Sequence, residues 1–286
     1  MRHLSEHIES LLSGHISADE LLEVNIRPPF SLPAGKIRLA SQMVGLIPKH
    51  TTYVEPFAGS AAVFFAKPAS EIEVLNDIDP AIAEALSALS KMSDEQLEAF
   101  MRRSWVGSQE RYSRLFNTDF SDAMDRLYRF LYLTRLSFGA MRRRTGFRRE
   151  DEGVDHRFFF ERRLPEAVSR IRGAKVMNDD YESVCKKYDS PDTFFFFDPP
   201  YKGYTGLQGI EGGQKERGFD EERFYNMLKS LKGKWLLNYG AQGSLMDMLR
   251  KDYKVSKVSA KRYIGHVNKN TENRVTSLTH YICRNY

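Results

Sequence analysis

The sequence predicts an α/β protein: a Rossmann-like, mostly parallel and doubly wound sheet, interrupted by an inserted, mainly helical domain that carries a basic hairpin. Three observations support this prediction. Residues 193–197 read TFFFF, which is typical of a strand buried on both faces of a parallel sheet. Residues 51–66 read as strand, glycine turn and helix. Residues 91–170 combine helical patterns with many arginines and aromatic residues.

The phenylalanine run leads directly into Asp198-Pro199-Pro200-Tyr201. Proline has no backbone N–H, so the two prolines end the hydrogen-bonded ladder of the strand. Asp198 is therefore expected at the carboxyl end of a central strand, where open α/β sheets bind their ligands. Tyr201 is expected to follow at the mouth of the same crevice.

This tetrapeptide suits a flat ring that bears an amino group. The Asp198 carboxylate can accept one N–H of an exocyclic amine, and the Pro199 carbonyl oxygen can accept the other. Holding both hydrogens favours a pyramidal nitrogen whose lone pair points at an electrophile. The Tyr201 ring can stack on a base taken out of its duplex. The structural alternative is an aspartate that caps a turn before a proline-stiffened loop.

The turn at residues 55–60, EPFAGS, indicates a nucleotide-type ligand near a helix N-terminus. It contains one glycine, Gly59, where a dinucleotide fingerprint requires three, so a pyrophosphate ligand is disfavoured. A smaller zwitterionic adenosine derivative needs fewer backbone contacts. In the loop before this unit, Lys36 stands at the start of a predicted helix, where a cation gains nothing from the helix dipole. This placement indicates an anionic partner nearby, and the structural alternative is a solvated lysine.

Acidic residues follow two further predicted strands. Asp77 and Asp79 come after the strand at 72–76, and we expect one to accept ribose hydroxyls and the other to cap the next helix. Asp180 follows the strand at 174–177. Its carboxylate is expected in the same crevice, within reach of the adenine of a cofactor.

Five arginines occur in the eight positions 142–149. This segment follows a helical pattern at 124–136 and is flanked by aromatic residues and glycines, so a hairpin is expected rather than a helix. Arginines there can contact phosphates or guanine edges, and Phe138 can wedge into a base stack. The structural alternative is a solvated, charged loop.

The remaining segments complete the predicted sheet and its flanks. Residues 1–27 read as two short helices with a packing role, and the glycine-rich residues 202–219 as a candidate lid. The other expected elements are a helix at 220–231, a strand at 235–238, a helix at 243–249 and a closing strand at 275–282.

The composition narrows the class of protein. The 286 residues carry a formal net charge of +5 with a sequence pI near 9.0, which is compatible with a polyanionic partner. Cys185 and Cys283 have no metal-ligand spacing, so neither a disulfide framework nor a metal site is expected. The sequence has no apolar stretch of membrane-spanning length and no secretory pattern, so a cytoplasmic protein without a membrane partner is expected.

Residues 28–286 resemble the Dam-type DNA adenine-N6 methyltransferases of the alpha motif order. The resemblance is carried by PPFSLPAGK, VEPFAGSAAVFF, LNDIDP, RFLYLTRLSFGAMRR, NDDY and FFFFDPPY, in the order of that family. It implies a class I methyltransferase sheet that transfers a methyl group from S-adenosylmethionine to a flipped-out adenine in duplex DNA, with S-adenosylhomocysteine as product and no metal. It further implies a catalytic domain at 28–90 and 171–286 and a target-recognition domain at 91–170, which leaves a helical extension at 1–27.

The resemblance also assigns roles to individual residues. Catalysis falls to the turn after the phenylalanine strand, with Asp198, Pro199, Pro200 and Tyr201. The expected cofactor contacts are Leu32, Lys36, Phe57, Gly59, Asp77, Asp180 and Asp198. Arg135, Phe138 and Arg143 match the DNA-recognition hairpin of the family, and the basic run adds further expected DNA contacts at Arg142, Arg144, Arg148 and Arg149.

Three departures from the family pattern are present. Residues 32–36, LPAGK, stand where the family has an aromatic residue and a double glycine before the lysine. Gly139 stands where the family has asparagine, and residues 147–151, FRRED, replace FN-x-P-x-G. The last two departures remove side chains expected to read bases and add ones that hold phosphates. An altered or relaxed sequence preference is therefore expected instead of the GATC target.

Other functions are compatible with these residues. The same chemistry can act on RNA, whose loops need no base flipping, or on the exocyclic N4 amine of cytosine. A non-catalytic nucleic-acid-binding protein on the same frame is a different class. The intact DPPY and the Gly59 turn argue against a non-catalytic protein, because a protein that has lost its enzymatic activity does not need to keep either feature. The sequence leaves the oligomeric state open, and a cognate restriction endonuclease is a candidate partner.

Overall fold

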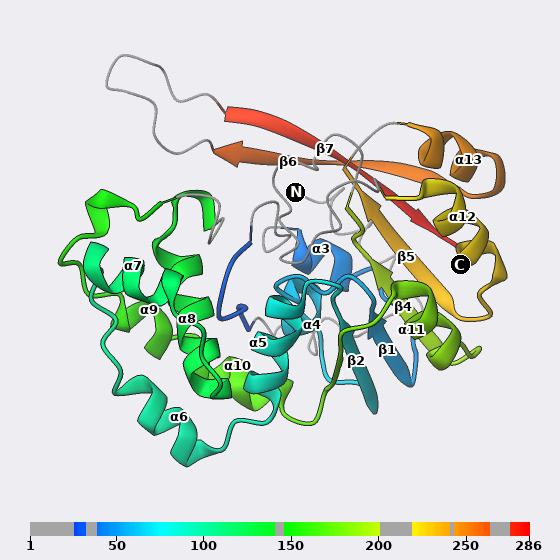
Figure 1. Ribbon diagram of the computed structural model, residues 1–286. Coiled ribbons are helices and arrows are strands. Elements are labelled where there is room, and N and C mark those ends of the chain that lie inside the picture. Colours follow the sequence, from blue (N-terminus) through cyan, green and yellow to red (C-terminus); the bar gives the residue numbers. More distant parts are fainter. Residues whose placement is uncertain (1–25, 33–38, 141–145, 201–218, 241–242, 264–274) are drawn as a thin grey trace, which may run out of the picture.

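One seven-stranded sheet organises the molecule (Figure 1). The computed structural model describes residues 26–32, 39–140, 146–200, 219–240, 243–263 and 275–286. The sheet has the order β3-β2-β1-β4-β5-β7-β6. Its strands are β1 Thr52–Glu55, β2 Ile72–Asn76, β3 Lys175–Met177, β4 Thr193–Phe197, β5 Lys234–Tyr239, β6 Val255–Tyr263 and β7 Val275–Arg284. The first five strands pair in parallel, and β7 is antiparallel to β5 and β6, which confirms the predicted α/β class.

β4 is the central strand, and all five of its residues are buried. Phe194 and Phe196 belong to the core on one face of the sheet, while Phe195 and Phe197 belong to the core on the other face. Each buried phenylalanine contributes about 1.5–3 kcal/mol relative to an exposed one. The prediction of a strand covered on both faces is confirmed.

Helices cover both faces, as a doubly wound sheet requires (Figure 1). The first face is covered by α3 Ala40–Val44, α4 Ala62–Ala66, α5 Pro80–Ser90, α8 Ala123–Leu136 and α10 Leu164–Ile171. The second face is covered by α11 Tyr181–Tyr188, α12 Glu221–Ser230 and α13 Ser244–Asp252. The last two helices and β7 match the elements expected near the end of the chain.

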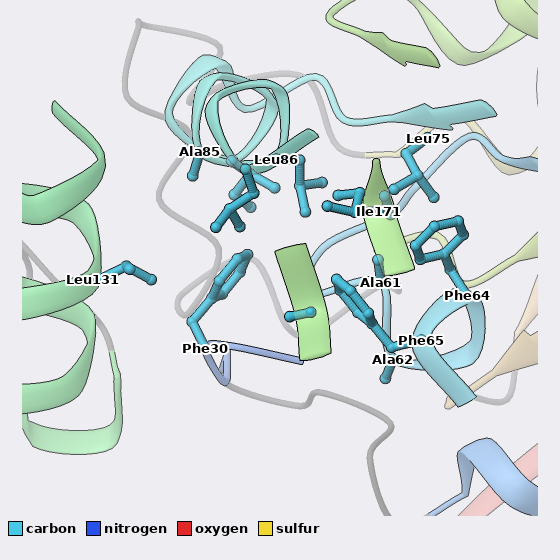
Figure 2. Close-up of a cluster of buried hydrophobic side chains, with 14 of the residues drawn as sticks. Phe30, Ala61, Ala62, Phe64, Phe65, Leu75, Ala85, Leu86, Leu131 and Ile171 are labelled. Carbon is cyan, nitrogen blue, oxygen red and sulfur yellow. The ribbon is translucent and has the colours of Figure 1, made fainter. Parts of the chain in front are cut away.

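The segment inserted between α5 and β3 is mainly helical, as predicted. It contains α6 Asp94–Met101, α7 Gln109–Asn117, α8, α9 Arg157–Glu161, α10 and two short 3-10 helices at Phe138–Ala140 and Arg149–Asp151. Its helices share a core with the sheet: Figure 2 shows Leu131 of α8 facing Phe30, with Ile171 of α10 beside Leu75 of β2. The domain boundaries near residues 90 and 170 stay a prediction.

Two expected features fall outside the part of the chain that the structure describes. They are the N-terminal helices, up to residue 25, and the candidate lid, up to residue 218. Among the described helices, none is long and apolar enough to span a membrane.

Candidate active site at the carboxyl edge of the sheet

The turns after β1 and β4 lie side by side at the carboxyl edge of the sheet. The two strands are neighbours, and their register pairs Val54 with Phe195. The Phe57 and Phe197 rings, which stand at the starts of the two turns, have their centroids 6.4 Å apart. The glycine turn that follows β1 and the acidic turn that follows β4 are therefore positioned on adjacent strands.

Gly59 gives the first turn its conformation. Its φ of +51° is a left-handed value that glycine adopts without the steric cost of a Cβ. Its N–H donates to the Asp77 Oδ2 atom at 2.8 Å. A Cβ at this position would lie 3.8 Å from the Leu32 Cδ1 atom, so Leu32 packs beside the turn. The structure thus brings together three of the predicted cofactor-binding residues.

The two acids after β2 have different partners. Asp79 caps α5, since its carboxylate accepts from the Ala81 N–H at 2.9 Å. Asp77 accepts from the Asp79 N–H at 2.9 Å as well as from Gly59. The capping role expected of one acid belongs to Asp79, and Asp77 faces the glycine turn.

A buried asparagine, Asn76, ties three of the site loops together. Its Nδ2 donates to the carbonyl oxygens of Pro56, at 2.9 Å, and of Asp179, at 3.0 Å. Its Oδ1 accepts from the Asp179 N–H at 2.9 Å. One side chain at the end of β2 therefore fixes the loops after β1 and β3. Sequence reasoning gave this residue no role, because its partners are distant in sequence.

A second buried asparagine, Asn238 of β5, orients Asp198. Its Nδ2 donates to the Asp198 Oδ1 atom at 3.0 Å, and Asn238 is fully buried while Asp198 is half-buried. The Asn238 Oδ1 atom is buried and has no hydrogen-bond partner among the described residues. The sequence indicated only that Asn238 ends a strand. Pro199, buried, and Pro200, half-buried, continue the turn.

Glu55, at the end of β1, is a third buried polar residue at this edge. It accepts from the Phe64 N–H at 2.8 Å and from the Tyr53 hydroxyl. Burial raises the pKa of Glu55 to about 8, and the charge of Asp198 adds to this effect. Burial at this edge of the sheet therefore favours the neutral form of the Glu55 carboxyl group.

Phe57 and Asp180 have partners within the protein. The Phe57 ring packs against Tyr181 of α11 and Phe224 of α12, with centroid distances of 5.1 and 6.0 Å. Asp180 caps α11 and pairs with Arg223 at 2.7 Å. Their cofactor contacts stay a prediction. Lys36 and Tyr201 lie outside the residues whose placement the structure gives.

The base of the expected hairpin is formed. Ser137 and Phe147 form an antiparallel bridge, and the Arg148 N–H donates to the Leu136 carbonyl oxygen at 2.9 Å. Phe138 is 53% exposed and Arg149 is exposed, whereas Arg148 forms an ion pair with Asp151. The segment from 141 to 145, with Arg142, Arg143 and Arg144, is outside the described ranges.

Comparison with known proteins adds to this geometry. Residues 34–264 match the model of a family described as D12 class N6 adenine-specific DNA methyltransferase. The chain is 24% identical over 266 residues to the Type II methyltransferase M.CviBI of Paramecium bursaria Chlorella virus NC1A, which covers 91% of this chain and 100% of that protein. It is 21% identical over 274 residues to the Type II methyltransferase M.MjaIII of Methanocaldococcus jannaschii, with 85% of this chain and 94% of that protein covered.

Proposed function

This chain belongs to the D12 class of N6 adenine-specific DNA methyltransferases, and from that premise we propose which of its residues perform the transfer. The resemblance found in the sequence is confirmed, as is the expected enzyme class. Membership of this family implies the use of S-adenosylmethionine and DNA as the substrate. The similarities give no support to the RNA or non-catalytic alternatives.

We propose that the Gly59 turn and Asp77 hold S-adenosylmethionine. Gly59 leaves its backbone open to a ligand, and its N–H fixes the Asp77 carboxylate at 2.8 Å. Ile78, which follows Asp77, is apolar yet 41% exposed, so it offers a purine ring a surface. The proposed set is completed by Leu32, Lys36, Phe57, Asp180 and Asp198. Among the described residues, no cluster of three or more His, Cys, Asp or Glu could bind a metal ion.

When bound, S-adenosylmethionine supplies an electrophilic methyl group. The residues of this chain hold the acceptor: the Asp198 carboxylate and the Pro199 carbonyl oxygen accept the two hydrogens of adenine N6. The Asp198 carboxylate also stabilises the positive charge that develops on N6. Pro200 stiffens the turn and Tyr201 stacks on the flipped base. The observation that carries this proposal is the orientation of Asp198 by the buried Asn238, beside the glycine turn.

We propose that residues 91–170 bind duplex DNA through the hairpin. The exposed Phe138 suits a wedge between base pairs, and the exposed Arg149 suits a phosphate. Arg135, Arg142, Arg143 and Arg144 complete the proposed contacts. The ion pair with Asp151 favours an anchoring role for Arg148 at the base of the hairpin. The presence of Gly139 and FRRED in place of base-reading side chains supports an altered or relaxed sequence preference.

Methylation of a random-sequence duplex library tests this preference. We expect modified adenines in contexts other than GATC, because Gly139 and residues 147–151 replace side chains that are expected to read bases in this family. Sequencing of modified bases after incubation with protein and S-adenosylmethionine gives the result, with an incubation without S-adenosylmethionine as control. A strict GATC pattern would exclude the altered preference and leave the enzymatic activity intact.

The naming of the relatives as Type II methyltransferases supports a further proposal, a cognate restriction endonuclease as functional partner. We expect an extract of the source cells to cleave unmethylated DNA and to leave intact DNA that this enzyme has methylated. Equal cleavage of both DNAs would contradict it.

A further inference from the structure

Two arginines from different helices contact one aromatic ring in the inserted segment. The Arg135 Cζ atom, in the last turn of α8, lies 4.3 Å from the centroid of Phe159, and the Arg163 Cζ atom lies 4.1 Å from it. Arg163 also donates from Nη1 to the Pro28 carbonyl oxygen at 3.4 Å. We call Arg135, Phe159 and Arg163 the Phe159 platform. It joins α8, α9 and the start of α10 to the segment at 26–32.

Within the described residues, neither arginine of the platform forms an ion pair with a carboxylate, and Arg135 donates from Nε to the His156 Nδ1 atom at 3.3 Å. Burial lowers the pKa of Arg163, and the nearby charges of Arg27 and Arg135 lower it further. Burial and the charge of Arg148 lower the pKa of Arg135, and the charge of Asp151, which is itself paired with Arg148, acts in the opposite direction. The half-buried guanidinium groups of Arg135 and Arg163 therefore share one ring, and the exposed Arg27 is near enough for its charge to act on Arg163.

The start of α10 adds to this positive potential. Arg163 is the N-cap residue of α10, an eight-residue helix, and its side chain makes no capping hydrogen bond. Helix N-termini favour anions and disfavour cations, so an arginine at this position is unfavourable without an anionic partner. Glu166 in the first turn is exposed. The repulsion among the arginines and with the helix dipole would be relieved together by one bound anion.

We propose that the Phe159 platform, with Arg27 at its edge, binds a backbone phosphate of the DNA substrate, next to the flipped nucleotide. This inference rests on the proposed function. The Arg148 Nη2 atom donates to the Arg135 carbonyl oxygen at 3.4 Å, which links the platform to the base of the hairpin. On its other side, Pro28 begins the segment that leads to Leu32, beside Gly59. The platform thus connects the recognition hairpin with the catalytic edge, where phosphate contacts position the backbone.

The salt dependence of DNA binding by Arg163→Gln tests the proposal. The variant removes one charge, so the slope of log K against log[NaCl] should decrease in magnitude by about 0.9, and binding should weaken equally for all duplex sequences. The charge-retaining Arg163→Lys should keep the wild-type slope. The matched control is Arg157→Gln on α9, an exposed arginine 3.9 Å from Asp155, which should also keep the wild-type slope.

Two further measurements keep the test decisive. Binding of S-adenosylhomocysteine and the midpoint of thermal unfolding show whether Arg163→Gln is folded. If it is not, Arg27→Gln replaces an exposed side chain and should lower the slope in the same direction. A wild-type slope in a folded Arg163→Gln that still methylates DNA would overturn the platform alone. Absence of DNA methylation by the wild-type protein would instead overturn the proposed function.

Discussion

Asp198→Ala should lower the rate of methyl transfer by at least about 10²–10³-fold, the cost typical of losing one preorganised electrostatic contact to the reacting group. Without the carboxylate, N6 keeps its flat geometry and its developing positive charge has no counterion. Affinity for duplex DNA should be retained. Single-turnover transfer at saturating DNA and S-adenosylmethionine measures the effect.

Two variants accompany this test. Asp247→Ala removes an exposed aspartate of α13 that pairs with Arg250 of the same helix at 3.1 Å, and should transfer at the wild-type rate. Asn238→Leu leaves the Asp198 charge in place and removes the donor that orients it, so an intermediate loss of rate with unchanged DNA affinity is expected. Substantial activity in Asp198→Ala would remove Asp198 from its proposed role.

Asp77→Ala should weaken binding of S-adenosylhomocysteine by about tenfold to a hundredfold, since hydrogen bonds to a charged group contribute about 1.5–3 kcal/mol. The substitution removes the proposed partner of the ribose and also releases the Gly59 N–H, which donates to this carboxylate at 2.8 Å. Isothermal titration calorimetry measures the affinity directly.

The neighbouring acid supplies the matched control. Asp79→Ala removes the N-cap of α5 and should reduce the free energy of unfolding by about 1 kcal/mol, with cofactor affinity retained. If Asp79→Ala lost cofactor affinity and Asp77→Ala kept it, the two acids would have the opposite roles.

The sheet could be predicted because its signals are local. Four phenylalanines followed by two prolines define both the burial of β4 and the residue at which it ends. The same reasoning placed acids at the carboxyl ends of β2 and β4. The partners of those acids could not be predicted, because Asn238 meets Asp198 across 40 residues and Asn76 meets Asp179 across 103.

The roles of residues within a run of like charges are also difficult to predict from the sequence. The sequence predicts that Arg148 and Arg149 are equivalent members of one basic segment, but the structure separates them. Arg148 turns inward to Asp151, three residues later, and Arg149 is exposed. The platform around Phe159 could not be predicted from the sequence for a related reason. Arg135 and Arg163 are far apart in the sequence and reach the same ring only in the fold, where the charge of Arg27 also acts on Arg163.

The proposed transfer to adenine N6 is tested most directly by a single-turnover reaction in which methyl-labelled S-adenosylmethionine is bound to the protein beforehand. The duplex DNA is then digested to nucleosides. If the Gly59 turn holds the methyl donor beside the adenine that the Asp198 turn holds, the label should appear in N6-methyladenine. Label in N4-methylcytosine, or label transferred to RNA while duplex DNA stays unmodified, would contradict it.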